Sequence, residues 1–266
     1  MAETQASECR ADAIIIAGGA ITQEDLRQAV GVDCRALIDL LGKPMAQWTA
    51  EALRGAATIG RVILIGRAEL WQTPIASAVD EIIDEGADEV ENLLRGVEAL
   101  PGAGLVYMTA GDIPLVTPEA IDDIVLNAPP DADVAYPIVN MDDIERAYPT
   151  RKLTFAKVPE GRYTGASCFL FRPDAVVANR RWVQAVFDAR RNNWRLMRMW
   201  GLVFGLRAWL GRVSIPEAEA HCSRILHLRA RAYLSRSADL CMDVDYPPDV
   251  VLIRECLKQR LAPEAG

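Results

Sequence analysis

Histidine is scarce in this chain, where only His221 and His227 occur among 266 residues. No CxxC pair occurs among the six cysteines, and the spacing of His221, Cys222 and His227 is not a standard zinc spacing. The chain also lacks a GxGxxG motif, which argues against a Rossmann dinucleotide site. The apolar stretch at 192–211 is interrupted by arginines and does not provide the roughly 20 consecutive apolar residues of a transmembrane helix.

Basic residues are in deficit overall, because 29 Lys and Arg face 37 Asp and Glu, a formal charge of −8. This balance argues against a general nucleic-acid binder. Residues 151–236 nevertheless hold 17 Lys and Arg against 5 Asp and Glu, which indicates an anionic ligand, an anionic surface or solvated helix faces. The opening MAETQASECRAD is polar and acidic, unlike a secretory signal, so we expect a cytoplasmic protein.

Apolar runs alternate with helical periodicities through the first half of the chain. The sequence predicts strands at 11–17, 61–66, 81–84 and 105–109, and helices at 24–30, 45–57, 90–100 and 118–127. Such alternation predicts an α/β fold, with a mostly parallel, doubly wound sheet in three α/β/α layers.

The second half changes character. Strands are predicted at 132–139, 167–171 and 230–234, and helices at 173–187, 216–223 and 249–259. No repeat or low-complexity linker divides the chain. We therefore expect one domain over 1–266, with a helical insertion at 188–228 before the closing strand and helix.

One helix face is predicted within the apolar stretch, formed by Leu196, Met199, Val203, Leu206 and Leu210. We expect this face to pack in the core or against a second subunit of a homodimer. Peripheral membrane contact through 194–212 is the alternative, because basic helices with Trp and Phe lie in the lipid interface.

Two glycines follow the first predicted strand, in Ala17-Gly18-Gly19-Ala20. Glycines let the backbone approach a ligand closely, and their amides can face phosphates. Downstream, Arg35 and Lys43 are suited to hold a triphosphate, Arg35 through paired hydrogen bonds and Lys43 as a point charge. Taken singly, each of these features also fits an ordinary turn or surface charge.

Asp112 stands at the carboxyl end of the predicted strand at 105–109, where ligands bind in open α/β sheets. Pro114 forces an extended exit and holds Asp112 at the strand tip. A second acidic cluster, DVDYPPD, spans 243–249. Two carboxylates from distant segments suit Mg²⁺, which takes few protein ligands. The alternative for Asp245 is an acidic residue before a helix N-terminus.

The order of these blocks is distinctive: AGG, RALIDLLGKPM, AGDIPLVTPE, TGASCFLFRPD and MDVDYPPDV. It resembles the MobA-like nucleotidyltransferases, which share the glycosyltransferase A-like fold with sugar-phosphate and polyol-phosphate nucleotidyltransferases. The resemblance runs from about Ala11 to Cys256. It implies Mg²⁺-dependent transfer of an NMP from an NTP to a small anionic, phosphorylated acceptor, with release of pyrophosphate.

The resemblance also implies roles for individual residues. Arg35 and Asp112 would be catalytic, and Asp112 and Asp245 would hold Mg²⁺. Thr164, Gly165 and Ala166 would line the acceptor. The nucleotide-binding residues would be Ala17, Gly18, Gly19, Ala20, Arg35, Lys43, Gly86, Asn92 and Gly111. Because the acceptor already carries a phosphate anion, no general base is required, and neither histidine is needed.

The chain departs from the family's AGGxGxRM loop, since it continues as AITQEDLRQAVGVDC. Arg35 stands where the signature lysine falls, and Lys43 matches the basic residue of the later G-[KR]-P element. Two alternatives therefore stay open. One is a glycosyltransferase of the same fold that uses Asp243-Val244-Asp245 as a DxD metal site, and the other is a catalytically weakened nucleotide-binding protein. The nucleobase and the acceptor are not readable from the sequence.

Overall fold

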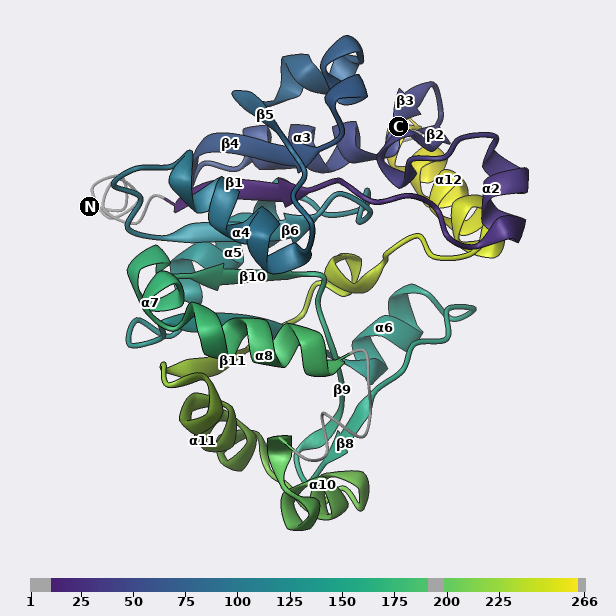
Figure 1. Cartoon of the computed structure of the whole chain (residues 1–266). Helices are drawn as coiled ribbons and strands as arrows, with labels where there is room; N and C mark the ends of the chain where they lie inside the picture. The colour runs from purple at the N-terminus through teal and green to yellow at the C-terminus, as the bar shows by residue number, and fades with distance from the viewer. Residues whose placement is uncertain (1–10, 191–198, 263–266) are drawn as a thin grey trace, which may run out of the picture.

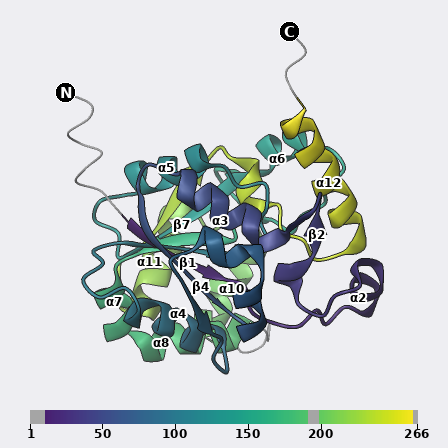
Figure 2. The same ribbon diagram turned by 90° about the horizontal axis from the view of Figure 1, so that it is seen from above.

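The computed structural model describes residues 11–190 and 199–262, and the structural statements below concern those residues. A mixed sheet runs through the centre, with helices on both faces (Figures 1 and 2). The strand order is β5-β4-β1-β6-β10-β7-β9-β8, with β11 also paired to β7. The strands are β1 (Ala11–Ile16), β4 (Ile59–Gly66), β5 (Glu81–Asp84), β6 (Val106–Ala110), β7 (Val134–Asn140), β8 (Ala156–Val158), β9 (Gly161–Gly165), β10 (Cys168–Phe171) and β11 (Ala230–Ser235). A small separate hairpin joins β2 (Asp39–Leu40) and β3 (Lys43–Pro44).

Strand direction confirms the predicted mostly parallel α/β sheet. Strands β5, β4, β1 and β6 are parallel neighbours. Strand β10 is antiparallel to both β6 and β7, so β7 and its parallel partner β11 again run with β1. From β1 the chain first winds outward to β4 and β5 and then returns to β6 on the other side of β1. The winding reverses between β1 and β6, and ligands in such sheets bind beyond the carboxyl ends of the strands at this point.

The helices connect the strands and cover the sheet. They are α2 (Glu24–Val30), α3 (Met45–Gly55), α4 (Glu89–Glu98), α5 (Pro118–Asn127), α6 (Met141–Ala147), α7 (Pro173–Ala178), α8 (Arg180–Arg190), α10 (Leu202–Trp209), α11 (Ile215–Leu226) and α12 (Pro247–Leu261). Seen from above, α3 and α5 lie on one side of the sheet, and α4, α7 and α8 lie on the other (Figure 2).

Two hydrophobic cores follow from the alternation of side chains along the strands. In β1, Ala13 and Ile15 belong to the core that includes α3, α5 and α12, whereas Ile14 belongs to the core under α4 and α8. Gly96 lets α4 approach the sheet, because a Cβ there would lie 2.6 Å from Cδ1 of Ile14. The predicted three-layer arrangement is therefore built from strands that are apolar on both faces.

Several predicted elements have the predicted bounds, including the helix at 24–30, the helix at 118–127 and the strand at 81–84. Thr117 caps α5, since its side chain accepts a hydrogen bond from the amide of Ala120. The single helix predicted at 173–187 is wrong, because the chain breaks at Asn179 into α7 and α8. The Asn179 side chain donates to the carbonyl of Ala175, which also accepts from the Asn179 amide at the end of α7.

The apolar stretch is described only from Met199 onward, so Leu196 and the rest of 191–198 lie outside the described residues. Gly201, with a φ of 82°, precedes α10 and separates it from Met199. The side chains of Val203 and Leu206 on α10 are exposed, so the prediction that they pack in the core of this chain is wrong. Within 11–190 and 199–262, no helix combines the length and apolarity needed to cross a membrane.

Candidate functional site

The carboxyl ends of β1 and β6 meet at the point where the sheet reverses its winding. The amide of Gly111 donates to the carbonyl of Ile16 at 2.9 Å, and the amide of Ala17 donates to that of Ile65 at 2.8 Å. A Cβ on Gly111 would lie 3.0 Å from the Cβ of Ala17, so a side chain there would push against Ala17. Ala17 and Gly111, both predicted to bind nucleotide, are thus neighbours at this edge.

The loop at 18–20 leaves the sheet from Ala17, with Gly19 at a φ of 93° that favours glycine. The amide of Gly19 donates to Oε2 of Glu85 at 2.8 Å, and a Cβ on Gly18 would overlap the same carboxylate. The loop amide therefore binds an anionic oxygen in this structure, although from a side chain and not from a phosphate. Sequence reasoning missed Glu85; its one signal is its place directly before Gly86.

Gly86 and Asn92, predicted to lie near the base, are joined by a hydrogen bond of 2.5 Å from the Gly86 amide to Oδ1 of Asn92. Asn92 is buried in α4. Asp88 caps that helix by accepting from the amides of Val90 and Glu91. Since Gly86 follows Glu85, this turn lies beside the glycine loop.

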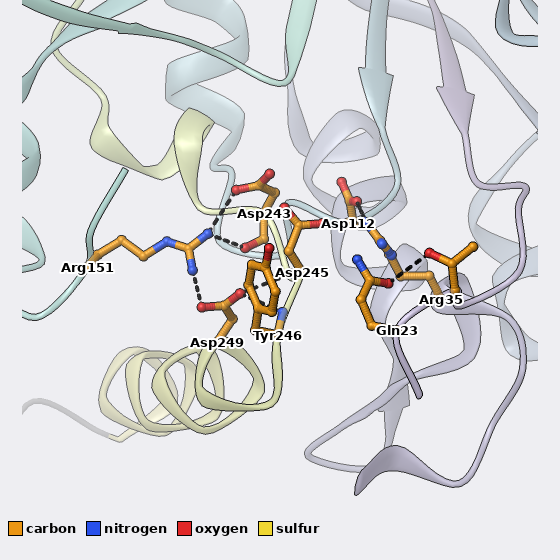
Figure 3. A network of polar contacts seen from close by, with 9 residues as sticks. Gln23, Arg35, Asp112, Arg151, Asp243, Asp245, Tyr246 and Asp249 are labelled. Carbon is orange, nitrogen blue, oxygen red and sulfur yellow. Dashed lines mark hydrogen bonds and ion pairs between the residues drawn. The ribbon is translucent and has the colours of Figure 1, made fainter. Parts of the chain in front are cut away.

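Arg35 joins the two predicted metal ligands. Its Nη1 donates to Oδ2 of Asp112 at 3.0 Å and to Oδ1 of Asp245 at 2.8 Å. The two carboxylate oxygens are thus at most 5.8 Å apart, the sum of the two distances. Asp112 lies 77 positions and Asp245 lies 210 positions from Arg35 in the sequence, and the fold brings both to one guanidinium group (Figure 3).

Negative charge is in excess around this group. Oδ1 of Asp112 is buried and has no hydrogen-bond partner. Burial raises the pKa of Asp112, with Asp245 adding to the rise and Arg35 opposing it. Burial, together with the charges of Asp245 and Asp112, raises the pKa of Asp243 to about 6. Carboxylates that are costly to ionise together favour a bound cation.

The carboxylates fit a hard divalent cation. Asp112 and Asp245 supply converging oxygens, and the unpartnered Oδ1 of Asp112 is a free ligand atom. In the part of the chain that the structure describes, no group of three or more His, Cys, Asp or Glu side chains is placed to hold a metal ion. An ion here would therefore complete its shell with phosphate oxygens and water.

Arg151 holds the Asp245 turn from the opposite side, and sequence reasoning did not single it out. Its guanidinium donates to Asp249 and to the side chain and carbonyl of Asp243 (Figure 3). Asp249 in turn accepts from the amides of Asp245 and Tyr246, at 3.0 Å and 2.8 Å. Arg151 and Asp249 are both nearly buried, so this pair fixes the turn that presents Asp245.

Lys43 is not part of this group. Its ammonium pairs with Glu51 at 2.7 Å and lies 4.5 Å from the centre of the Trp48 ring. These contacts hold Lys43 against α3, on the β2–β3 hairpin. Ala20, the last residue of the glycine loop, forms an isolated bridge with Cys34, the residue before Arg35.

Arg35, Asp112 and Asp245 together form what we call the Arg35 group. A cavity of about 750 Å³ opens beside this group. Gly165 and Ala166 line it together with Arg35, Asp112 and Asp245, so the structure brings two of the three predicted acceptor residues to this place. Thr164 does not line it and pairs with Val139 in the sheet. A Cβ on Gly165 would overlap the Tyr136 hydroxyl, which explains the glycine.

Comparisons with known proteins show which family the chain resembles. The sequence-family model described as "MobA-like NTP transferase domain" matches residues 13–199 of the chain. The chain is 35% identical over 89 residues to a 2-C-methyl-D-erythritol 4-phosphate cytidylyltransferase of Cereibacter sphaeroides, and 31% identical over 84 residues to a probable molybdenum cofactor guanylyltransferase of Pyrococcus furiosus. These matches cover 31% and 32% of this chain and only 40% and 41% of the two relatives.

Among solved structures, a hypothetical transferase from Thermus thermophilus is similar over nearly the whole length of both chains. The superposition has a TM-score of 0.82 at 30% identity, and it covers 91% of this chain and 99% of the other.

Proposed function

Because the chain belongs to the MobA-like NTP transferase family, we propose that it is a cytoplasmic, Mg²⁺-dependent nucleotidyltransferase. It would transfer an NMP from an NTP to a small phosphorylated acceptor and release pyrophosphate. The observation that carries this proposal is the convergence of Asp112 and Asp245 on Arg35, beside the glycine loop and the cavity.

In the proposed reaction an acceptor phosphate oxygen attacks the α-phosphorus of the NTP in line, and the bond to pyrophosphate breaks. The Gly19 amide binds a phosphate oxygen in place of Glu85, and Gly86 with Asn92 borders the base. Arg35 compensates the charge of the departing pyrophosphate. Asp112 and Asp245 would hold Mg²⁺, which supplies charge neutralisation to the phosphates when bound.

The arrangement of Asp243 favours this reaction over glycosyl transfer. A DxD site would place Asp243 and Asp245 on one metal ion. Here Asp243 faces Arg151, whereas Asp245 faces Arg35 and Asp112 (Figure 3). The metal pair is therefore better formed by Asp112 with Asp245 than by Asp243 with Asp245.

We also propose that α10 contacts an anionic membrane surface. Its apolar side chains are exposed, with Val203 at 76% and Trp209 at 81%. Arg207 and Arg212 accompany them, as in helices that lie in the lipid interface. A homodimer contact through the same face is the competing outcome.

The test is a screen of the four common NTPs against phosphorylated acceptors, with Mg²⁺ present and pyrophosphate release as the readout. Sugar, polyol and cofactor phosphates form the first acceptor panel. We expect release with at least one pair and none without acceptor. Release of a nucleoside diphosphate from a nucleoside diphosphate sugar, without pyrophosphate, would instead support a glycosyltransferase. Nucleotide binding without any turnover would support a weakened binding protein.

A further inference from the structure

The cavity beside the Arg35 group has two chemically different ends. Arg35, Asp112, Asp243 and Asp245 line it at the reaction centre. Away from them, the walls from β6, β10, α7, α8 and α11 are mostly apolar, and Thr109, Tyr136 and Ser167 are the hydroxyl-bearing lining residues. The apolar lining includes Met108, Phe169, Val176, Val183, Val186 and Leu226.

This apolar wall is part of the core on the α4 and α8 side of the sheet. Val176 and Val183 are buried there, and Leu226 of α11 packs against them. The one charged lining residue outside the reaction centre is Glu89, at the start of α4, among the residues that the structure describes. A volume of about 750 Å³ is in the range that encloses a small organic ligand.

The cavity lies on the predicted acceptor side of the site. Gly165 and Ala166 line it, whereas Gly18, Gly19 and Gly86 of the predicted nucleotide site do not. A sugar or polyol presents several hydroxyl groups, and most of this wall, formed by valine, leucine, methionine and phenylalanine, offers them no hydrogen-bond partner, which makes their burial unfavourable. An apolar group gains free energy in the same space.

We propose that the acceptor is an amphiphilic phosphate monoester, with its phosphate at the polar end of the cavity and a hydrocarbon chain in the apolar part. This inference rests on the proposed function. One oxygen of the acceptor phosphate forms a bond to the α-phosphorus of the NTP, and the bond to the β-phosphate bridge oxygen breaks. The products are a nucleoside diphosphate linked to the hydrocarbon chain, and pyrophosphate.

Binding of a simple homologous series tests the inference without turnover. Ethyl, hexyl, decyl and tetradecyl phosphate are titrated below their micelle-forming concentrations, with heat or protein fluorescence as the readout. We expect the dissociation constant to fall with chain length, by up to about fourfold for each methylene group buried. Equal affinity for ethyl and decyl phosphate would overturn the inference.

Two matched variants locate the chain. Val186→Phe fills the cavity wall on α8, and Val177→Phe makes the same change on the exposed face of α7. Val186→Phe should reduce the ratio of decyl to ethyl affinity by tenfold or more, and Val177→Phe should leave it unchanged. Leu226→Phe on α11 repeats the test should Val186→Phe unfold, as circular dichroism would show. An unchanged ratio in the folded cavity variant would refute the placement.

Pyrophosphate release separates this inference from the proposed function. Turnover with short phosphates, and no gain from a hydrocarbon chain, would leave the nucleotidyltransferase standing and remove the inference. Binding that strengthens with hydrocarbon chain length, without pyrophosphate release from any NTP, would support the apolar binding site and remove the nucleotidyltransferase. Decyl phosphate is assayed both free and in vesicles, which tells whether the acceptor is taken from solution or from a bilayer.

Discussion

The backbone amide of Val244 donates to the carbonyl oxygen of Asp112 at 3.2 Å. This single bond joins the end of β6 to the segment before α12, so the carboxylates of Asp112 and Asp245 reach the same guanidinium group from two directions. The proposed metal pair is thus held by main-chain geometry, and substitutions of either side chain should leave the fold intact.

Asp112→Asn and Asp245→Asn should each lower turnover by roughly two orders of magnitude or more. Each substitution removes a charged oxygen ligand and with it several kcal/mol of charge stabilisation in the transition state. Each 1.4 kcal/mol lost lowers the rate about tenfold. Pyrophosphate release measures the effect, and circular dichroism checks the fold. Asp131→Asn, an exposed surface aspartate, is the control. Near-normal rates in both site variants would remove the mechanism.

Arg35→Met should tighten Mg²⁺ binding in the absence of nucleotide by roughly tenfold, while it lowers turnover. The guanidinium, 3.0 Å from Asp112 and 2.8 Å from Asp245, would compete with a divalent cation for these two carboxylates. A unit charge this close is worth several kcal/mol near a protein surface. Titration calorimetry with Mg²⁺ measures the first effect. Arg27→Met, an exposed arginine on α2, should change neither quantity. Weaker Mg²⁺ binding in Arg35→Met would contradict the competition.

Arg151→Met should lower the free energy of unfolding by about 3 kcal/mol, because it leaves the nearly buried Asp249 without its charged partner. It should also lower kcat more than it raises the nucleotide KM, since Arg151 acts through the Asp245 turn. Urea unfolding and steady-state kinetics measure the two effects. Arg146→Met is the control, because Arg146 is 75% exposed and surface pairs contribute at most about 1 kcal/mol. Unchanged kcat would show that Asp245 does not depend on this pair.

Glu85→Gln should strengthen NTP binding by roughly tenfold, because it removes a negative charge from the place of the phosphates. The amide oxygen of glutamine still accepts from Gly19, so the loop keeps its shape. Glu69→Gln is the matched control and should leave NTP binding unchanged. Arg67 forms ion pairs with both Glu69 and Glu85, so the two substitutions make the same change beside the same arginine. Isothermal titration calorimetry with a non-hydrolysable NTP measures the affinity. Weaker binding by Glu85→Gln would contradict the prediction and would mean that Glu85 contributes to the nucleotide site.

Trp209→Ser should weaken binding to anionic lipid vesicles by at least about tenfold, because it removes an exposed aromatic side chain from the proposed contact with the lipid. Trp71→Ser is the control, since Trp71 is also exposed but lies outside α10. Co-sedimentation with vesicles measures the effect. A chain that ignores vesicles and instead forms a dimer dependent on Trp209 would assign the face to a subunit contact.

Local patterns predicted most of the secondary structure. The apolar strands and the capped helix at 118–127 depend on neighbours in the sequence, which is why their bounds were predicted well. The break at Asn179 lies within a continuous run of helical spacing, and periodicity does not report it. The apolar face of α10 has helical spacing, but spacing does not say whether a partner covers it.

The sequence by itself determined the alternation of strands and helices, the glycine loop and the two acidic segments, because each is a property of adjacent residues. Only the tertiary structure decided that Asp112 and Asp245 share Arg35, that Arg151 holds the Asp245 turn, that Glu85 binds the glycine loop, and that one end of the cavity is mostly apolar. These relationships join segments separated by up to 210 positions. The path of the sheet creates them, and no local pattern encodes that path.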